Sequence, residues 1–300
     1  MDVFFAWAHS DPYYHAVVPH CGMLVSVPNV SSVWTVRRFP NLPARLMIDS
    51  GGYQALKGET PSVRSTFLRQ VEMAAGVPGT LFCALDAPLP KGGLAPRERY
   101  ARVERTIANA YAYKALAAEL SPALPGQLLA IIQGDDLASI RYCAEELARI
   151  GFARYGLGSL AMLYNPQEIV RRVTAALDIV GPNLHVFGVS ATSTMRELAH
   201  MGVGSVDTAR PMHAAVYNVV FYSQPFRRYG ILGTQYQRGN AKFSRDRELS
   251  SPLPCDCPPC REQPSRLLAP RGQAAIHHRA LHNGYHLARE VASLSGGRSE

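Results

Sequence analysis

Short apolar runs recur along the chain, and helical patterns separate several of them. Each run is continuously apolar rather than alternating, which is typical of parallel strands that are buried on both faces. The runs lie at residues 3–7, 23–27, 46–49, 81–86, 128–133, 155–158, 185–190 and 205–207. The helical patterns lie at residues 97–120, 136–150, 166–180 and 193–201.

Strand-then-helix units of this kind, repeated about eight times, are what a (β/α)8 barrel needs. Two of the helical patterns begin with suitable capping residues, since Asp136 and Asn165 occupy N-cap positions and Pro166 a first helical position. A doubly wound open sheet is the alternative. It typically carries a Gly-x-Gly-x-x-Gly loop after its first strand, and no such loop follows residues 3–7. We therefore predict an α/β protein with a (β/α)8 TIM barrel.

Polar or small residues stand at the carboxyl ends of the predicted strands, where TIM barrels build their active sites. These ends carry Asp49-Ser-Gly-Gly-Tyr53-Gln, Asp86, Gln133-Gly134, Gly156-Leu-Gly-Ser159-Leu160, Gly188 and Asp207. Any one of them is more often a turn or cap residue than a catalytic group. Together, three carboxylates and a glutamine would supply a group that attacks, a group that moves a proton, and edges that bind a planar heterocycle. Tyr53 would stack on such a ring.

The six cysteines divide into two groups. Cys21, Cys83 and Cys143 have apolar or helical surroundings and are expected to be buried thiols. The other three form Cys255-Asp-Cys257-Pro-Pro-Cys260, whose spacing can place thiolates round one tetrahedral metal ion. A histidine can complete the set, and the candidates are His277, His278, His282 and His286. We predict a structural zinc site, with three incidental reactive cysteines as the alternative.

The pattern changes after about residue 211, where strand and helix signals become weak. Residues 223–275 are rich in Pro, Arg, Gly and Gln, contain the cysteine cluster, and precede a final helical pattern at 274–294. The predicted organisation is therefore a barrel domain at 1–222. A zinc-binding region with a C-terminal helix, packed on the barrel, follows at 223–300.

Composition and charge narrow the classes of function. Hydrophobic residues make up 47% of the chain, which allows a sizeable core, and the net charge of +8 with a pI near 9.3 suits a polyanionic partner. The sequence shows no N-terminal signal peptide and no apolar run long enough to cross a bilayer. We therefore expect a cytoplasmic protein without a membrane partner.

These features together resemble the guanine transglycosylases, base-exchange enzymes best known from tRNA modification with queuine and archaeosine precursors. Asp49-Ser-Gly-Gly-Tyr-Gln54 is similar to the family's Asp-Ser-Gly-Gly-Phe/Tyr-Gln signature. Ile-Ile-Gln133-Gly134 resembles its base-binding strand, Gly158-Ser-Leu-Ala161 its Gly-Gly-Leu-Ala loop, and His185-Val-Phe-Gly-Val189 the strand that lines its base pocket. The cysteine cluster, followed by His282-Asn283, is similar to its zinc set. The resemblance covers residues 40–290, approximately.

The resemblance implies a role for each matching residue. Asp207 would be the nucleophile that forms a covalent glycosyl ester, and Asp49 the general acid and base. Asp86 and Gln133, with Gly134 and backbone groups of Ser159 and Leu160, would bind the guanine edge, while Gly188 would line the pocket and Tyr53 would stack on the base. The zinc ligands would be Cys255, Cys257, Cys260 and His282. The incoming base would be a 7-deazaguanine.

Two departures from the family pattern bear on the polymer. The family's nucleophile is usually followed by Pro-Thr-Arg-x-x-Arg, whereas Asp207 is followed by Thr-Ala-Arg-Pro-Met-His. The chain is also shorter than usual. Because a branch of the family inserts 7-deazaguanines into DNA, tRNA and DNA are equally supported as the partner. The candidates for phosphate contacts are Arg210, Arg227, Arg228 and Arg238.

Two other interpretations compete with a catalytic transglycosylase. The first is a non-catalytic, nucleic-acid-binding partner subunit, and the presence of both Asp49 and Asp207 counts against it. The second is a glycoside hydrolase barrel, which the cysteine-rich tail and the Ser-Gly-Gly-Tyr sequence disfavour. The sequence leaves open whether the protein acts as a homodimer or with an unlike partner subunit.

Overall fold

The computed structural model describes residues 1–52, 61–90, 94–120, 124–160, 163, 165–234, 237–238, 241–242, 245–269 and 272–295. Tyr53 and the side chain of Arg238, both named above as candidates, lie outside the described residues. Among the described helices, none combines the length and apolar character that crossing a bilayer needs.

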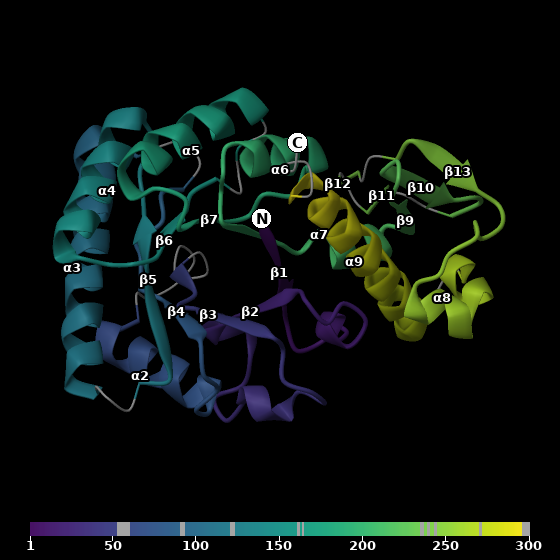
Figure 1. Cartoon of the computed structure of the whole chain (residues 1–300), viewed down its shortest axis with the longest axis horizontal. Helices are drawn as coiled ribbons and strands as arrows, with labels where there is room; N and C mark the ends of the chain where they lie inside the picture. Colours follow the sequence, from purple (N-terminus) through teal and green to yellow (C-terminus); the bar gives the residue numbers. More distant parts are fainter. Residues whose placement is uncertain are drawn as a thin grey trace.

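Eight parallel strands close into a barrel in sequence order, with β1 paired to β8 (Figure 1). The strands are β1 (Asp2–Trp7), β2 (Gly22–Ser26), β3 (Arg45–Asp49), β4 (Thr80–Cys83), β5 (Gly126–Ile132), β6 (Tyr155–Leu157), β7 (Leu184–Val186) and β8 (Ser205–Thr208). Each strand overlaps one of the predicted apolar runs, although β4 and β7 end three and four residues before their runs do. The predicted α/β class and TIM barrel are therefore confirmed.

Most of the helices surround the barrel, and the two predicted caps form. These helices are α2 (Val63–Ala74), α3 (Pro96–Leu120), α4 (Leu137–Ile150), α5 (Pro166–Val180), α6 (Thr192–His200) and α7 (Arg210–Val216). Asp136 accepts a hydrogen bond from the Ser139 amide, and Asn165 accepts one from the Gln167 amide. The sequence pattern missed α2, because its buried face includes the polar residues Thr66 and Gln70, which weaken its apolar periodicity.

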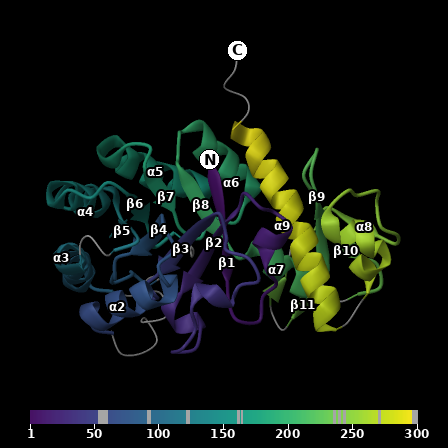
Figure 2. The ribbon, with the colours of Figure 1, turned by 60° about the horizontal axis from the view of Figure 1, so that its bottom comes forward.

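The strand-then-helix alternation is incomplete at the start of the chain. The connection from β1 to β2 holds only the short 3-10 turn η1 (Tyr14–Ala16), and the connection from β2 to β3 holds only η2 (Val27–Asn29) and η3 (Val36–Arg38). The C-terminal helix α9 (Gln273–Ser295) packs against β1, η1, α6 and α7, and so covers this side of the barrel (Figure 2). Gly284 permits the close approach, because a Cβ atom there would lie 2.8 Å from the Tyr14 ring.

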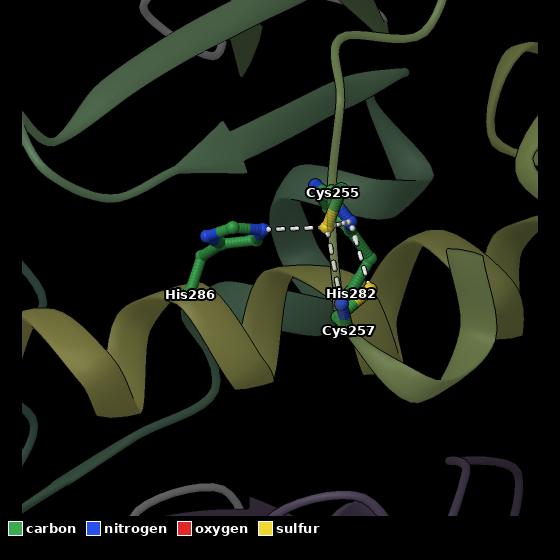
Figure 3. Close-up of side chains that lie close together, drawn as sticks. All are labelled: Cys255, Cys257, His282 and His286. Carbon is green, nitrogen blue, oxygen red and sulfur yellow. Dashed lines mark hydrogen bonds between the residues drawn. The ribbon is translucent and has the colours of Figure 1, made fainter. Parts of the chain in front are cut away.

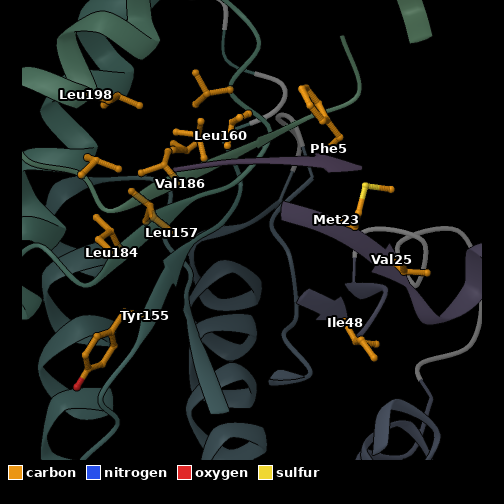
Figure 4. Packing of buried hydrophobic residues seen from close by; sticks show 14 of the residues in the cluster. Phe5, Met23, Val25, Ile48, Tyr155, Leu157, Leu160, Leu184, Val186 and Leu198 are labelled. Carbon is orange, nitrogen blue, oxygen red and sulfur yellow. The ribbon is translucent and has the colours of Figure 1, made fainter. Parts of the chain in front are cut away.

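Alternate residues of each strand face the inside and the outside of the barrel. An inner cluster contains Phe4, Leu24, Met47, Cys83, Leu129 and Ile131. Their strand neighbours, among them Phe5, Met23, Val25 and Ile48, belong to the outer core that packs against the helices (Figure 4). Because side chains alternate with a period of two, the residues two positions beyond an inner residue also face inward. This alternation aims Ser26, Asp49 and Gln133 into the barrel.

The chain after α7 forms a small sheet and a cysteine-rich segment beside the barrel (Figure 1). The sheet has the order β13 (Arg247–Leu249), β10 (Arg227–Ile231) and β9 (Val219–Tyr222), and β11 (Gln237–Arg238) pairs with β12 (Ala241–Lys242). The segment continues through α8 (Pro258–Glu262) and η4 (Pro264–Leu268) to α9. Since β9 and β10 pair across residue 222, the division at this residue stays a proposal.

Candidate active site and metal cluster

A cavity of about 260 Å³ opens at the carboxyl ends of the barrel strands. Its wall combines three carboxylates, a glutamine, small residues and apolar side chains. The lining residues are Ala6, Leu24, Ser26, Asn29, Asp49, Asp86, Pro88, Leu89, Ile131, Gln133, Gly158, Ser159, Leu160, Phe187, Gly188 and Asp207. The structure thus brings Asp49, Asp86, Gln133 and Asp207 together from four different strand ends, which is the arrangement that TIM-barrel enzymes use.

Asp49 ends β3 and is held by neighbours on two sides. The Ser26 hydroxyl donates to its Oδ2 atom at 2.8 Å, and the Gly51 amide donates to the same atom at 3.2 Å. Ser26 and Asp49 are register partners in β2 and β3, so the pairing of these strands sets the contact. Burial raises the pKa of Asp49, and the charge of Asp207 adds to this rise, although the hydrogen bonds oppose it.

Asp86 belongs to a buried chain of hydrogen bonds. The Gln133 amide donates to Asp86 Oδ2 at 2.5 Å, and the Ser159 hydroxyl donates to Gln133 Oε1. Ser159 Oγ in turn accepts from the Leu89 amide at 3.1 Å. Burial, followed by the charge of Asp49, raises the pKa of Asp86 to about 7. These hydrogen bonds fix the orientation of the Gln133 amide, with its Nε2 atom toward Asp86 and its Oε1 atom toward Ser159.

The two glycines that follow Asp49 each meet a local structural requirement. Gly51 adopts φ +85°, a left-handed conformation that glycine tolerates best. A Cβ atom at Gly52 would lie 1.9 Å from Asp86 Oδ1, so the space beside this glycine is filled by the Asp86 carboxylate. Glycine at this position therefore allows two acidic strand ends to approach each other.

Asp207 lies in β8 with 8% of its surface exposed. Its Oδ1 atom accepts a hydrogen bond of 2.7 Å from the Gly188 amide and lies 3.4 Å from His185 Nε2. Gly188 has φ +71°, and this turn directs its amide at the carboxylate. Within the described part of the chain, Oδ2 accepts no hydrogen bond, which leaves one oxygen for chemistry.

Not every predicted site residue lies in the cavity wall. Leu160 and Gly188 line the cavity together with Ser159. Gly134 instead packs against the start of α4, since a Cβ atom there would lie 2.6 Å from the Ile140 amide nitrogen. Ser26 and Phe187 also line the cavity, although neither is among the candidates named from the sequence; the period-two alternation of β2 and β7 accounts for both.

This arrangement can carry acid–base and nucleophilic chemistry at one point. Two carboxyl groups, Asp49 and Asp86, have raised pKa values, in the case of Asp86 to about 7, and so hold a proton more readily than exposed carboxyl groups do, whereas Asp207 accepts an amide hydrogen bond. Carboxyl groups in unlike environments are a common basis for dividing the roles of nucleophile and proton carrier.

The cysteines and two histidines of α9 form a compact cluster (Figure 3). One ligand atom from each of Cys255, Cys257, His282 and His286 lies within 4.8 Å of the others. Cys260 joins them, because its sulfur lies 3.2 Å from His282 Nδ1. Hydrogen bonds from Cys257 and Cys260 lower the pKa of Cys255 well below its ordinary value, so this group can present a thiolate. The donor set suits a metal ion that prefers sulfur and nitrogen.

The two histidines differ in how their rings are held. His282 turns Nδ1 toward the three sulfurs, at 3.4 Å from Cys257 and 3.8 Å from Cys255, while Nε2 is 2.6 Å from the Phe221 carbonyl. The carbonyl can only accept, so Nε2 carries the proton and Nδ1 is free to bind a metal. His286 is the reverse, because the Ser223 amide donates to its Nδ1 atom at 3.1 Å. Its Nε2 atom, 3.2 Å from the Cys255 sulfur, therefore carries the proton when the ring is neutral.

The candidate arginines lie in the region after β8. Arg228 forms an ion pair of 2.7 Å with Asp246, and Arg227 donates to the Phe226 carbonyl. Burial, followed by the charge of Arg228, lowers the pKa of Arg210 to about 10. Arg228 is therefore paired with the carboxylate of Asp246, and it would have to give up this ion pair to contact a phosphate.

Comparisons with known proteins agree with this site. The family model described as queuine tRNA-ribosyltransferase matches residues 25–295. A queuine tRNA-ribosyltransferase of Methylacidiphilum infernorum is 29% identical to the chain over 147 residues, which cover 47% of this chain and 35% of that relative. The matched region contains the strand ends that carry the carboxylates and the whole Cys/His cluster. The chain therefore belongs to the queuine tRNA-ribosyltransferase family.

Proposed function

We propose that the protein is a guanine transglycosylase, which exchanges a guanine in nucleic acid for a 7-deazaguanine through a covalent bond to Asp207. The observation that carries this proposal is the convergence of Asp49, Asp86, Gln133 and Asp207 on one cavity. Exchange with retention at an anomeric carbon requires a carboxylate nucleophile and a second group that moves a proton. Family membership supports the same reaction class.

The proposed exchange has two steps. In the first, Asp207 Oδ2 attacks C1′ of the target nucleotide, the bond between C1′ and the guanine nitrogen breaks, and Asp49 gives its proton to the departing base. The raised pKa of Asp49 favours the form that holds this proton. In the second, Asp49 takes a proton from the incoming 7-deazaguanine, whose nitrogen attacks C1′ and releases Asp207.

Base recognition is assigned to the hydrogen-bonded chain around Asp86. The edge of guanine presents adjacent N–H donors, and an ionised carboxylate such as Asp86 offers only acceptors. The Gln133 amide, oriented by Ser159, supplies a donor for the carbonyl oxygen of the base. Leu160 and Gly188 form the wall, and Tyr53 is proposed to stack on the ring, since a base that leaves its helix needs a stacking surface.

For the polymer we favour tRNA. The matching family description and the name of the relative both specify tRNA. DNA is the second candidate, because the segment after Asp207 departs from the pattern that the family uses to contact the anticodon loop. The basic charge of the chain suits either polyanion.

We also propose that Cys255, Cys257, Cys260 and His282 hold one structural zinc ion. The fit rests on the ring of His282, whose unprotonated Nδ1 atom faces all three sulfurs while Nε2 donates to Phe221. His286 is assigned as an N–H donor to the Cys255 thiolate rather than as a ligand. When bound, zinc would tie the segment of residues 255–260 to α9.

The experiment that tests the function is a base-exchange assay with the wild-type protein. Labelled guanine and a labelled 7-deazaguanine are each offered with tRNA, duplex DNA and single-stranded DNA. We expect label to enter tRNA. Label in DNA alone would assign the protein to the DNA-modifying branch. Binding of nucleic acid without any incorporation, by folded and zinc-loaded protein, would favour the non-catalytic subunit and refute the proposed exchange.

A further inference from the structure

One buried histidine touches the proposed nucleophile from inside the barrel, away from the cavity. His185 lies in β7 with 2% of its surface exposed, and its ring packs edge-on against Phe4 and Phe187. Its Nδ1 atom is 2.8 Å from the Ser205 hydroxyl, and its Nε2 atom is 3.4 Å from Asp207 Oδ1. His185 is not part of the cavity wall, so it can reach the reacting atoms only through Asp207.

The chemistry of these partners selects one tautomer of the ring. A carboxylate oxygen can only accept, whereas a serine hydroxyl can donate or accept. A proton on Nδ1 would leave the Nε2 lone pair facing Asp207 Oδ1, which is repulsive. With the proton on Nε2, Ser205 donates to Nδ1 and the ring offers its N–H to Oδ1. Within the described part of the chain, Nε2 forms no hydrogen bond to any group that could compete for this proton, and its 3.4 Å approach to Oδ1 is longer than a normal hydrogen bond.

We infer that His185 is a positioning residue, which together with the Gly188 amide fixes the rotation of the Asp207 carboxylate. The Gly188 amide donates to Oδ1 from the turn after β7, and His185 Nε2 lies 3.4 Å from the same atom, from where a small shift of either side chain would close a second hydrogen bond. The other oxygen, Oδ2, is thereby held toward the cavity as the attacking atom. During the proposed step the C1′–Oδ2 bond forms, and Oδ1 becomes the ester carbonyl, which still accepts from the same donors. This inference rests on the proposed function.

A pair of substitutions separates the contact with Asp207 from the contact with Ser205. His185→Asn can reach Ser205 but not Asp207, whereas His185→Gln can place an amide N–H near the former Nε2 position. We expect His185→Asn to slow covalent attachment of Asp207 in a single-turnover assay by about tenfold to a hundredfold. The KM for free base should stay unchanged, and His185→Gln should recover most of the rate. Thermal unfolding of both variants controls for a general loss of stability.

A second measurement keeps the inference testable if either variant fails to fold. Nitrogen-15 NMR of the wild-type protein reports which ring nitrogen of His185 carries the proton, and we expect Nε2. A proton on Nδ1, or equal rates for the Asn and Gln variants, would overturn the positioning role. Wild-type protein that forms no covalent adduct would refute the proposed function instead, while the NMR result would still decide the geometry.

Discussion

The barrel mouth and the Cys/His cluster both contain buried polar groups. At the mouth these include carboxyl groups of like charge, whereas in the cluster they are groups that can share one metal ion. At the mouth, burial raises the pKa of both Asp49 and Asp86, and a neighbouring carboxylate adds to each rise: Asp207 to that of Asp49, and Asp49 to that of Asp86. Within the described residues, no Lys or Arg forms an ion pair with either of them. In the cluster, the thiols and the His282 ring satisfy one another, and the backbone of Phe221 accepts the remaining ring proton.

The difference shows what each region is built for. Burying like charges beside each other is unfavourable, and such groups persist mainly where an active site needs them. The mouth also keeps an open cavity beside these groups, so that a substrate can complete their hydrogen bonds. The cluster is closed, and one metal ion would complete it. Accordingly, changes at the mouth should alter chemistry while sparing the fold, and changes in the cluster should do the reverse.

The largest effect is expected at Asp207. Asp207→Asn keeps the size of the side chain but replaces the attacking oxygen with a poor nucleophile. Base exchange should fall by about a thousandfold or more, with little change in the unfolding temperature. The measurement is incorporation of labelled guanine, with gel analysis of the covalent adduct. Asp178→Asn, a change at an exposed ion pair on α5, is the matched control and should leave exchange intact. Full activity in Asp207→Asn would remove this residue from the nucleophile role.

The next largest effect tests the opposite side of the comparison. Cys257→Ser should lose one tightly bound zinc ion per chain and lower the free energy of unfolding by several kcal/mol. Zinc content by elemental analysis and chemical denaturation provide the measurement. Cys21→Ala is the control, because burial raises the pKa of Cys21 to about 12 and keeps it a thiol. His286→Gln should retain the ion. Loss of zinc from His286→Gln with retention in His282→Ala would exchange the roles of the two histidines.

The sequence predicts the barrel well because each strand is buried on both faces and reads as a continuous apolar run. It also predicts the acidic strand ends, since Asp49, Asp86 and Asp207 directly follow or end such runs. It does not predict α2, whose buried Gln70 bonds to the backbone of β3 and β4. Nor can it place Gly134 outside the cavity, and the spacing of the histidines alone does not choose between His282 and His286, although the family resemblance implies His282. Those details depend on side-chain contacts between segments that are far apart in the sequence.

Asp86 is expected to lower the stability of the folded protein at high pH, although its ionised form is the one proposed to bind the base. Its pKa is raised from 3.8 to about 7, so the folded state binds the proton more tightly than the unfolded state. This contribution favours the folded state below pH 4, approximately, and is lost as the pH rises to about 7. Asp86→Asn, which does not titrate, should therefore be more stable than wild type at pH 8, by up to about 4 kcal/mol. The difference should shrink on acidification.

The same substitution should weaken base binding, because an asparagine amide has only one acceptor oxygen and replaces the other with an NH2 group, which cannot accept from the N–H donors of guanine. Urea unfolding at several pH values gives the stability difference, and calorimetric titration with free base gives the affinity. The affinity of the wild-type protein should rise as the pH passes 7, when Asp86 ionises. An unchanged base affinity in Asp86→Asn would contradict its assignment to the base edge, even if the stability changes as expected.

The smallest effects are expected from alanine substitutions of two glycines, Gly158 in the cavity wall and Gly134 outside it. A Cβ atom at Gly158 would lie 2.4 Å from Gln133 Nε2, which is the movable end of a side chain. Gly158→Ala should therefore shift this amide away from Asp86 and raise the KM for free base by about tenfold, with a stability change of about 1 kcal/mol. Gly134→Ala would meet the backbone of α4 instead, so it should lower stability and leave that KM unchanged. Steady-state kinetics with free base and thermal unfolding of both variants provide the comparison. If Gly134→Ala raised the KM as much as Gly158→Ala, then Gly134 would belong to the base site, and the boundary of the cavity would have to be redrawn.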